Sequence, residues 1–162
     1  MSTSDPSVKP PYLGLLNAIS LGERSAGQYL KAWADVTPDA ALKYALSLVA
    51  ARETTHGEVF RQRIERLGFS LREKDDPEAA ERLDVYGDPA RSDVEKIRWR
   101  RRQGSEASTE EFFASIDRQV ADESVDPLTR DTLRWYVHEE RDSRALLCAA
   151  YDLIAGSADG TA

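Results

Sequence analysis

Three glutamates and one histidine occupy positions where the apolar pattern predicts the core of a helical protein. They are Glu23, Glu53, His56 and Glu140. Burying an ionised carboxylate costs several kcal/mol unless the group is paired, protonated or bound to a metal. A shared cation would compensate several such groups at once, so metal binding is the chemistry that these four residues suggest.

Glu53 and His56 form the pattern E-x-x-H. Residues three apart project from the same face of a helix, so one carboxylate and one imidazole can hold a common ion. Oxygen and nitrogen donors of this kind suit iron or manganese, whereas thiolates suit zinc or iron–sulfur clusters. Cys148 is the single cysteine. It can form neither an internal disulfide nor a cysteine-based metal site, and we expect a cytoplasmic protein.

Apolar residues at helical spacing predict an all-α fold. Four long helices are expected, over residues 11–35, 38–67, 93–120 and 127–154, with an interruption of the third at Gly104 and Ser105. Thr37 and Pro38 are expected to cap and start the second helix, and Gly68 to end it. Residues 69–92 carry seven acidic side chains and lose the helical period, which predicts a long solvated connection.

Two short turns and one long connection predict a four-helix bundle with a single crossover between the second and third helices, the topology of ferritin-like folds. The first turn lies about 13 residues after Glu23 and about 16 residues before Glu53, so the two side chains can meet. Glu140 lies about 15 residues beyond the second turn, near Val125. The matching level on the third helix falls near Glu110 or Glu111, and Glu106 is a further candidate. We take Glu110 as the predicted ligand.

The chain has 162 residues and a formal charge of −7. This length suffices for one domain with its own core, so a metal would serve chemistry rather than folding. We expect a disordered arm over residues 1–11, the bundle over 12–155 and a flexible tail over 156–162. Neither a secretory signal nor a membrane-spanning segment is predicted.

On these residues the chain resembles the ferritin-like di-iron carboxylate proteins, and most closely the rubrerythrin-type domain. The resemblance covers residues 12–155. It rests on Glu23 followed by Tyr29, on Glu53-Thr54-Thr55-His56 followed by Phe60, and on Glu139-Glu140.

The resemblance implies two iron or manganese ions, held by Glu23, Glu53, His56, Glu140 and a glutamate of the third helix. It also implies oxygen- or peroxide-dependent oxidation. Ser143 stands where this family has its second histidine, which leaves one metal position short of a donor. Met1 is the only methionine, so haem ligation by methionine, as in bacterioferritins, is not expected. Without a rubredoxin-like module, the reductant would come from an electron-donor protein.

Two alternatives involve basic residues. Arg144, four residues after Glu140, could neutralise the core carboxylates, which would make the protein a metal-free scaffold with a structural or binding role. The run Arg98-Trp99-Arg100-Arg101-Arg102 resembles a nucleic-acid patch, but the net charge of −7 favours a solvated or internally paired face. We therefore expect no nucleic-acid partner. A homodimer is compatible with the sequence, and iron storage would require a closed cage.

Overall fold

The computed structural model describes residues 9–104 and 106–159, which are helical with no strand among them. This confirms the predicted all-α class. The helices are α1 (Leu13–Val36), α2 (Ala40–Arg66), α3 (Ala79–Gly87), α4 (Asp93–Gln103), α5 (Glu106–Ala121) and α6 (Pro127–Asp159).

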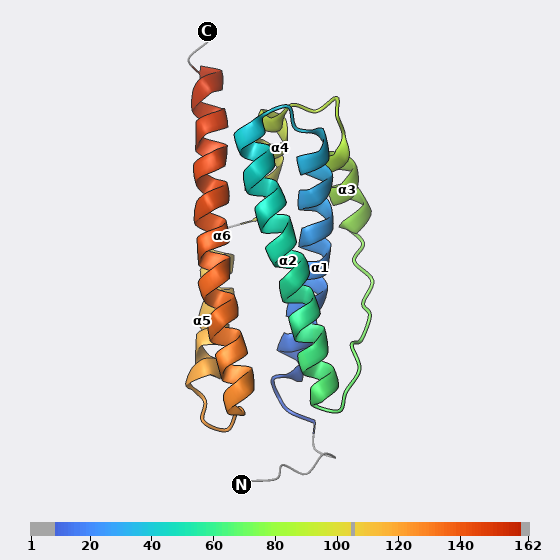
Figure 1. Ribbon diagram of the computed structural model, residues 1–162, viewed down its shortest axis with the longest axis vertical. Helices are drawn as coiled ribbons and strands as arrows, with labels where there is room; N and C mark the ends of the chain where they lie inside the picture. Colours follow the sequence, from blue (N-terminus) through green and yellow to red (C-terminus); the bar gives the residue numbers. More distant parts are fainter. Residues whose placement is uncertain (1–8, 105, 160–162) are drawn as a thin grey trace.

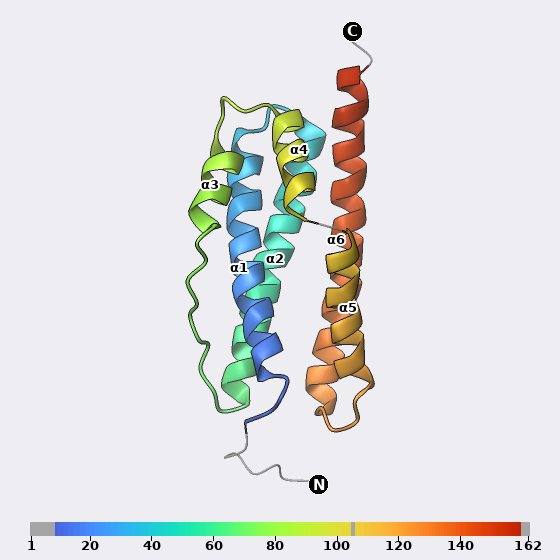
Figure 2. The ribbon, with the colours of Figure 1, turned by 180° about the vertical axis from the view of Figure 1, so that it is seen from behind.

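The long helices α1 and α2 lie side by side and antiparallel, and α6 runs beside α2 along the long axis of the molecule (Figure 1). Helices α4 and α5 follow one another along this axis, and both pack against α6 (Figure 2). The chain between α2 and α3 runs along the outside of α1.

The ends of the first two helices follow from local chemistry. Helix α1 ends at Val36, and the Thr37 amide donates to the Trp33 carbonyl at 3.0 Å. The N-cap of α2 is Asp39, whose side chain accepts from the Leu42 amide at 2.7 Å, and not Thr37 as the sequence predicted. Gly68 has a φ of 85°, the left-handed conformation expected for a glycine that ends a helix.

The core consists of two apolar clusters with a polar layer between them. One cluster contains Leu16, Ile19, Phe60 and Val137, and the other contains Leu30, Val49, Ala50 and Leu147. On α1, α2 and α6 alike, the residues between these two groups are those predicted to bind metal. The sequence pattern therefore placed the polar residues at the correct level of the fold.

The predicted solvated connection over residues 69–92 contains a helix that the sequence pattern did not reveal. Helix α3 buries Val85 and Tyr86, and the Tyr86 ring stacks on Trp33 of α1 with centroids 5.1 Å apart. Helix α6 continues to Asp159, three residues beyond the predicted start of the tail at 156. The rest of that tail, 160–162, and residues 1–8 of the predicted arm lie outside the described residues.

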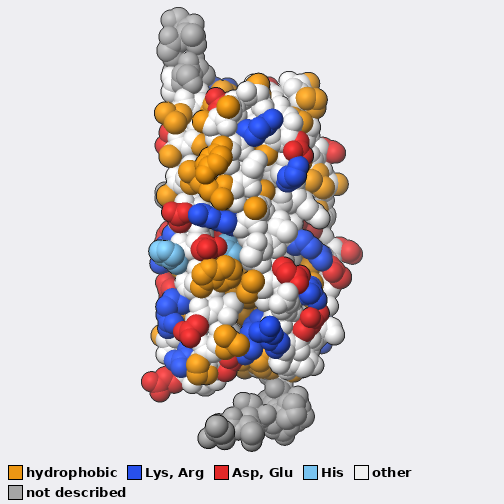
Figure 3. Space-filling model, in the orientation of Figure 1, with side chains coloured by type: hydrophobic (Ala, Val, Ile, Leu, Met, Phe, Trp, Pro, Cys, Tyr) orange, Lys and Arg blue, Asp and Glu red, His pale blue; other side chains and the backbone are white. Residues whose placement is uncertain are grey.

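Over the face in view, acidic and basic side chains are interspersed, with no large area of one sign (Figure 3). Within the described residues, no helix carries an apolar stretch long enough to cross a membrane.

Candidate metal centre

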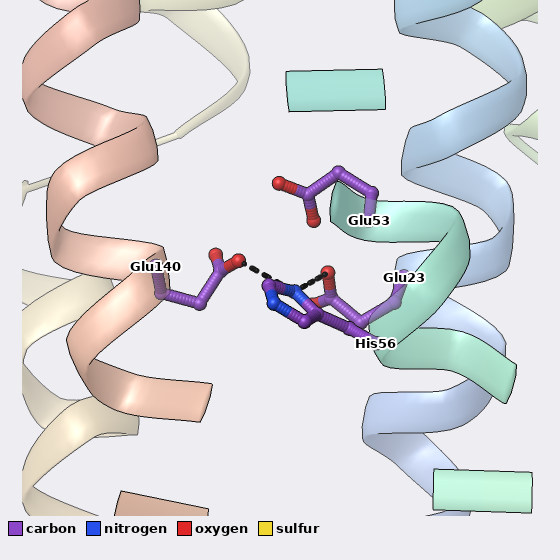
Figure 4. Close-up of side chains that lie close together, drawn as sticks. All are labelled: Glu23, Glu53, His56 and Glu140. Carbon is purple, nitrogen blue, oxygen red and sulfur yellow. Dashed lines mark ion pairs between the residues drawn. The ribbon is translucent and has the colours of Figure 1, made fainter. Parts of the chain in front are cut away.

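The structure brings together four of the five predicted ligands, here called the Glu/His cluster: Glu23, Glu53, His56 and Glu140. Each offers one oxygen or nitrogen atom, and these atoms all lie within 4.8 Å of one another. The side chains come from α1, α2 and α6 and point into the space between these helices (Figure 4). Glu23, Glu53 and His56 are buried and Glu140 is half-buried.

A close approach of α1 and α2 brings their ligands together. At Gly57, one residue after His56, an added Cβ would lie 3.1 Å from the Arg24 amide nitrogen and the Ser20 carbonyl oxygen. The Ser20 hydroxyl donates to the Gly57 carbonyl oxygen at 2.7 Å across the same contact. Gly57 therefore allows the backbones to approach beside the cluster.

The His56 ring is fixed in orientation. It is completely buried, and the rings of Trp135 and Tyr136 pack edge-on against it with centroids 5.0 and 5.2 Å away. Its Nε2 atom lies 2.9 Å from Glu139 Oε2. Its Nδ1 atom faces the cluster, 3.2 Å from Glu140 Oε1 and 3.6 Å from Glu23 Oε2 (Figure 4).

Three buried polar atoms of the cluster have no hydrogen bond in the structure: Glu23 Oε2, His56 Nδ1 and Glu140 Oε1. Buried polar atoms in native proteins almost always have a partner. Here three such atoms face one another. His56 Nδ1 lies close to both carboxylate oxygens, but without the geometry of a hydrogen bond. The other Glu23 oxygen is satisfied, because Tyr136 Oη donates to Oε1 at 2.7 Å. The donor set and its unsatisfied atoms therefore fit a cation.

Without a metal, protons compensate part of the negative charge. Burial, and then the charges of Glu23 and Glu140, raise the pKa of Glu53 to about 11. Burial alone would lower the pKa of His56, but the surrounding carboxylates raise it to about 10. Burial raises the pKa of Glu140. Burial acts in the same direction on Glu23, but the interactions with His56 and Tyr136 lower its pKa overall. At neutral pH, Glu53 is therefore neutral and His56 is a cation.

Glu110 does not join the cluster. Its side chain is exposed, and its Oε1 lies 3.8 Å from Arg144 Nη1. Helix α5 buries Phe113 and Ile116, and at the level of the cluster it presents Thr109 and Phe113. Of the two other candidates, Glu111 is exposed, and the side chain of Glu106 lies outside the described residues.

Ser143 and Arg144 take different places. Ser143 is buried beside Glu140, and its Oγ accepts a hydrogen bond from Arg52 Nη1 at 3.2 Å. Arg144 Nη1 lies 3.8 Å from Glu110 Oε1. Arg144 also lines the cavity beside the Glu/His cluster, so the alternative in which it neutralises the core carboxylates stays a prediction.

Sequence reasoning did not identify the surroundings of the cluster. Glu139 contacts His56, and Tyr136 contacts both His56 and Glu23. The two residues lie one and four positions before Glu140 on the same helix, and this spacing could have indicated that they are close to the cluster. A cavity of about 560 Å³ also opens beside the cluster and is lined in part by Arg100. Nothing in the run of basic residues indicated that one arginine turns inward.

No model of a known protein family matches the chain, and neither the proteins of curated function nor the solved structures include a significant match. The functional argument therefore rests on the geometry of the site.

Proposed function

We propose that the Glu/His cluster binds non-haem iron or manganese, and that the protein catalyses an oxygen- or peroxide-dependent oxidation. The observation that carries the proposal is the set of three buried, unsatisfied atoms of Glu23, His56 and Glu140 that face one another. Oxygen and imidazole donors without thiolates suit these two metals. We further propose a ferritin-like four-helix bundle in which α4 and α5 together take the place of the third helix and residues 69–92 form the crossover.

The four donors are enough for a first ion. Glu53 and Glu140 each have a second oxygen that would be available to a second ion, and two ions remain our expectation. Bound iron or manganese would supply Lewis acidity and a change of oxidation state. Ser143 and Thr109 line the adjoining cavity. Neither is a strong metal ligand, so coordination positions on that side would stay open to water or an oxidant.

The protein's own residues would orient and shield this centre. Glu139 fixes the His56 ring through Nε2 and leaves Nδ1 for the metal. Tyr136 holds a proton between its own oxygen and Glu23. Trp135 and Tyr136 pack against the imidazole and exclude water from that side. The reductant would come from an electron-donor protein.

The test is metal analysis of the full chain, expressed with iron or manganese supplementation and purified without chelators. We expect about two ions per chain. Replacing both Glu53 and His56 by alanine should abolish uptake while the helical circular dichroism is retained. His138→Ala is the matched control, because His138 is the only other histidine and is exposed on α6.

Less than about 0.2 ion per chain in the wild type would overturn the proposal, since a site of this donor type should retain metal. If the double variant also unfolded, the metal-free scaffold would be the better interpretation.

A further inference from the structure

The cavity beside the Glu/His cluster has two chemically different ends. Its volume is about 560 Å³, within the range of small-molecule sites. Glu53 and Glu140 line it at the cluster, and Arg100 and Tyr151 also line it. Tyr151 is eleven residues after Glu140 on α6, which places it about 16 Å farther along the helix. The wall is largely apolar and aromatic, and includes Tyr29, Leu30, Val49, Trp99 and Leu147.

Arg100 differs from the other arginines of its helix. Arg98 and Arg102 are exposed, and Arg101 pairs with Asp152 at 2.8 Å. Arg100 is partly buried and lines the cavity, with its guanidinium carbon 6.0 Å from the centre of the Tyr29 ring. Among the described residues no carboxylate forms an ion pair with it. A guanidinium withdrawn from water in this way favours an anion as its partner.

A second unsatisfied group lies in the same cavity. The Tyr151 hydroxyl oxygen is buried and has no hydrogen bond in the structure. The side chain is only 5% exposed, and burial raises its pKa, so the hydroxyl stays protonated and can donate. An arginine and a tyrosine hydroxyl on one cavity are the donors that a carboxylate group requires.

We infer that this cavity binds an organic monocarboxylate, whose carboxylate group pairs with Arg100 and Tyr151 and whose apolar body extends toward Glu53 and Glu140. Arg82, Arg101 and Arg144 also line the cavity, but each of them has a carboxylate partner, Asp76, Asp152 and Glu110 respectively. Arg100 is the arginine of the wall that has no ion pair among the described residues, which favours one negative charge, and the cluster carboxylates disfavour a multiply charged anion such as phosphate. The apolar wall favours a hydrocarbon or aromatic body over a sugar. That this molecule is the substrate of the oxidation rests on the proposed function.

The test uses benzoate as the probe and isothermal titration calorimetry of the full chain, both after chelator treatment and after manganese loading. Arg100→Met should weaken benzoate binding at least about tenfold, because it removes a charge-assisted bond. Arg98→Met is the matched control on the same helix and should leave binding unchanged. Tyr151→Phe keeps the ring and should weaken binding about threefold, which provides a second variant if Arg100→Met does not fold.

Equal benzoate affinity in wild type and Arg100→Met would overturn the inference, as would equal affinity for benzyl alcohol or phosphate in the wild type. The result is separable from the metal proposal. Arg100-dependent binding of benzoate to a chain that takes up no metal would support the cavity and refute the proposed function. Metal uptake without benzoate binding would support the proposed function and refute the inference about the cavity.

Discussion

The Nε2 atom of His56 lies 2.9 Å from an oxygen of Glu139, on the side of the ring away from the Glu/His cluster. Imidazoles that ligate metals usually donate their second N–H to a carboxylate or carbonyl, which fixes the tautomer and the ring. His56 has the same arrangement. Its Nε2 contacts Glu139, and Nδ1 is the ring nitrogen that faces the other donors. In the proposed metal site, Glu139 would therefore position His56 without being a ligand itself.

Replacing Glu139 by alanine should weaken metal binding about 10- to 100-fold, since the ring loses the partner that orients it. Competition with a metallochromic chelator measures this affinity. Asp131→Ala, which removes an exposed carboxylate from the same helix, serves as the control. An unchanged affinity in Glu139→Ala would show that ring packing alone orients His56.

Metal uptake should release protons at neutral pH. Glu53, with a pKa of about 11, and His56, with a pKa of about 10, both hold a proton in the metal-free protein. A metal binds their deprotonated forms, so the apparent affinity should rise with pH across the range from 6 to 8. Calorimetric titration with Mn²⁺ in buffers of different ionisation enthalpy should give a release of about two protons. No dependence on the buffer would contradict the assigned protonation states.

The long helices could be predicted because apolar spacing and helix-ending residues are local features of the sequence. Gly68 ends α2 as expected, and the predicted third helix is interrupted at Gly104, between α4 and α5. Helix α3 escaped prediction because it has only nine residues, two of them acidic, and is stabilised by a contact with a residue far away in sequence. The burial of Tyr86 depends on Trp33, a partner more than fifty residues earlier that no periodicity could reveal.

The four cluster residues were predictable because each interrupts an apolar stripe on a long, unbroken helix. Glu110 was not, because counting the rise per residue gives the level of a side chain but not the direction in which it points. Helix α5 begins after the break at Gly104, so its inward face is set by Phe113 and Ile116. Arg100 likewise depends on how α4 docks, which the composition of its basic run leaves open.

Glu53→Gln should stabilise the metal-free protein. Folding raises the pKa of Glu53 from its ordinary value of 4.5 to about 11, so above pH 4.5 folding requires this carboxyl group to take up a proton. Its contribution to stability therefore falls as pH rises from 4.5 toward 11. Glutamine mimics the protonated form without this penalty, which predicts a gain of about 1–3 kcal/mol at pH 7 and none below pH 4. Urea unfolding with a chelator present measures the difference.

Glu58→Gln is the control for that change, because Glu58 lies on the same helix but is exposed. With metal bound, the wild type should be more stable than Glu53→Gln, because glutamine removes a ligand and with it part of the stabilisation by bound metal. A metal-free Glu53→Gln variant less stable than wild type would show that the glutamate is ionised and favourably paired in the folded protein.

Gly57→Ala should loosen the contact between α1 and α2 beside the cluster. Its Cβ would lie 3.1 Å from backbone atoms of Ser20 and Arg24, which cannot rotate away as a side chain could. We expect a loss of about 1–2 kcal/mol in the free energy of unfolding, despite the better helix propensity of alanine. Gly22→Ala is the matched control, because nothing lies within 4 Å of its Cβ position. That variant should instead gain about 0.5–1 kcal/mol.

If the backbones separate, metal affinity should fall in Gly57→Ala alone, since Glu23 and His56 lie on the two helices that move apart. Equal stability and metal affinity in the two variants would show that this approach is not needed to assemble the site.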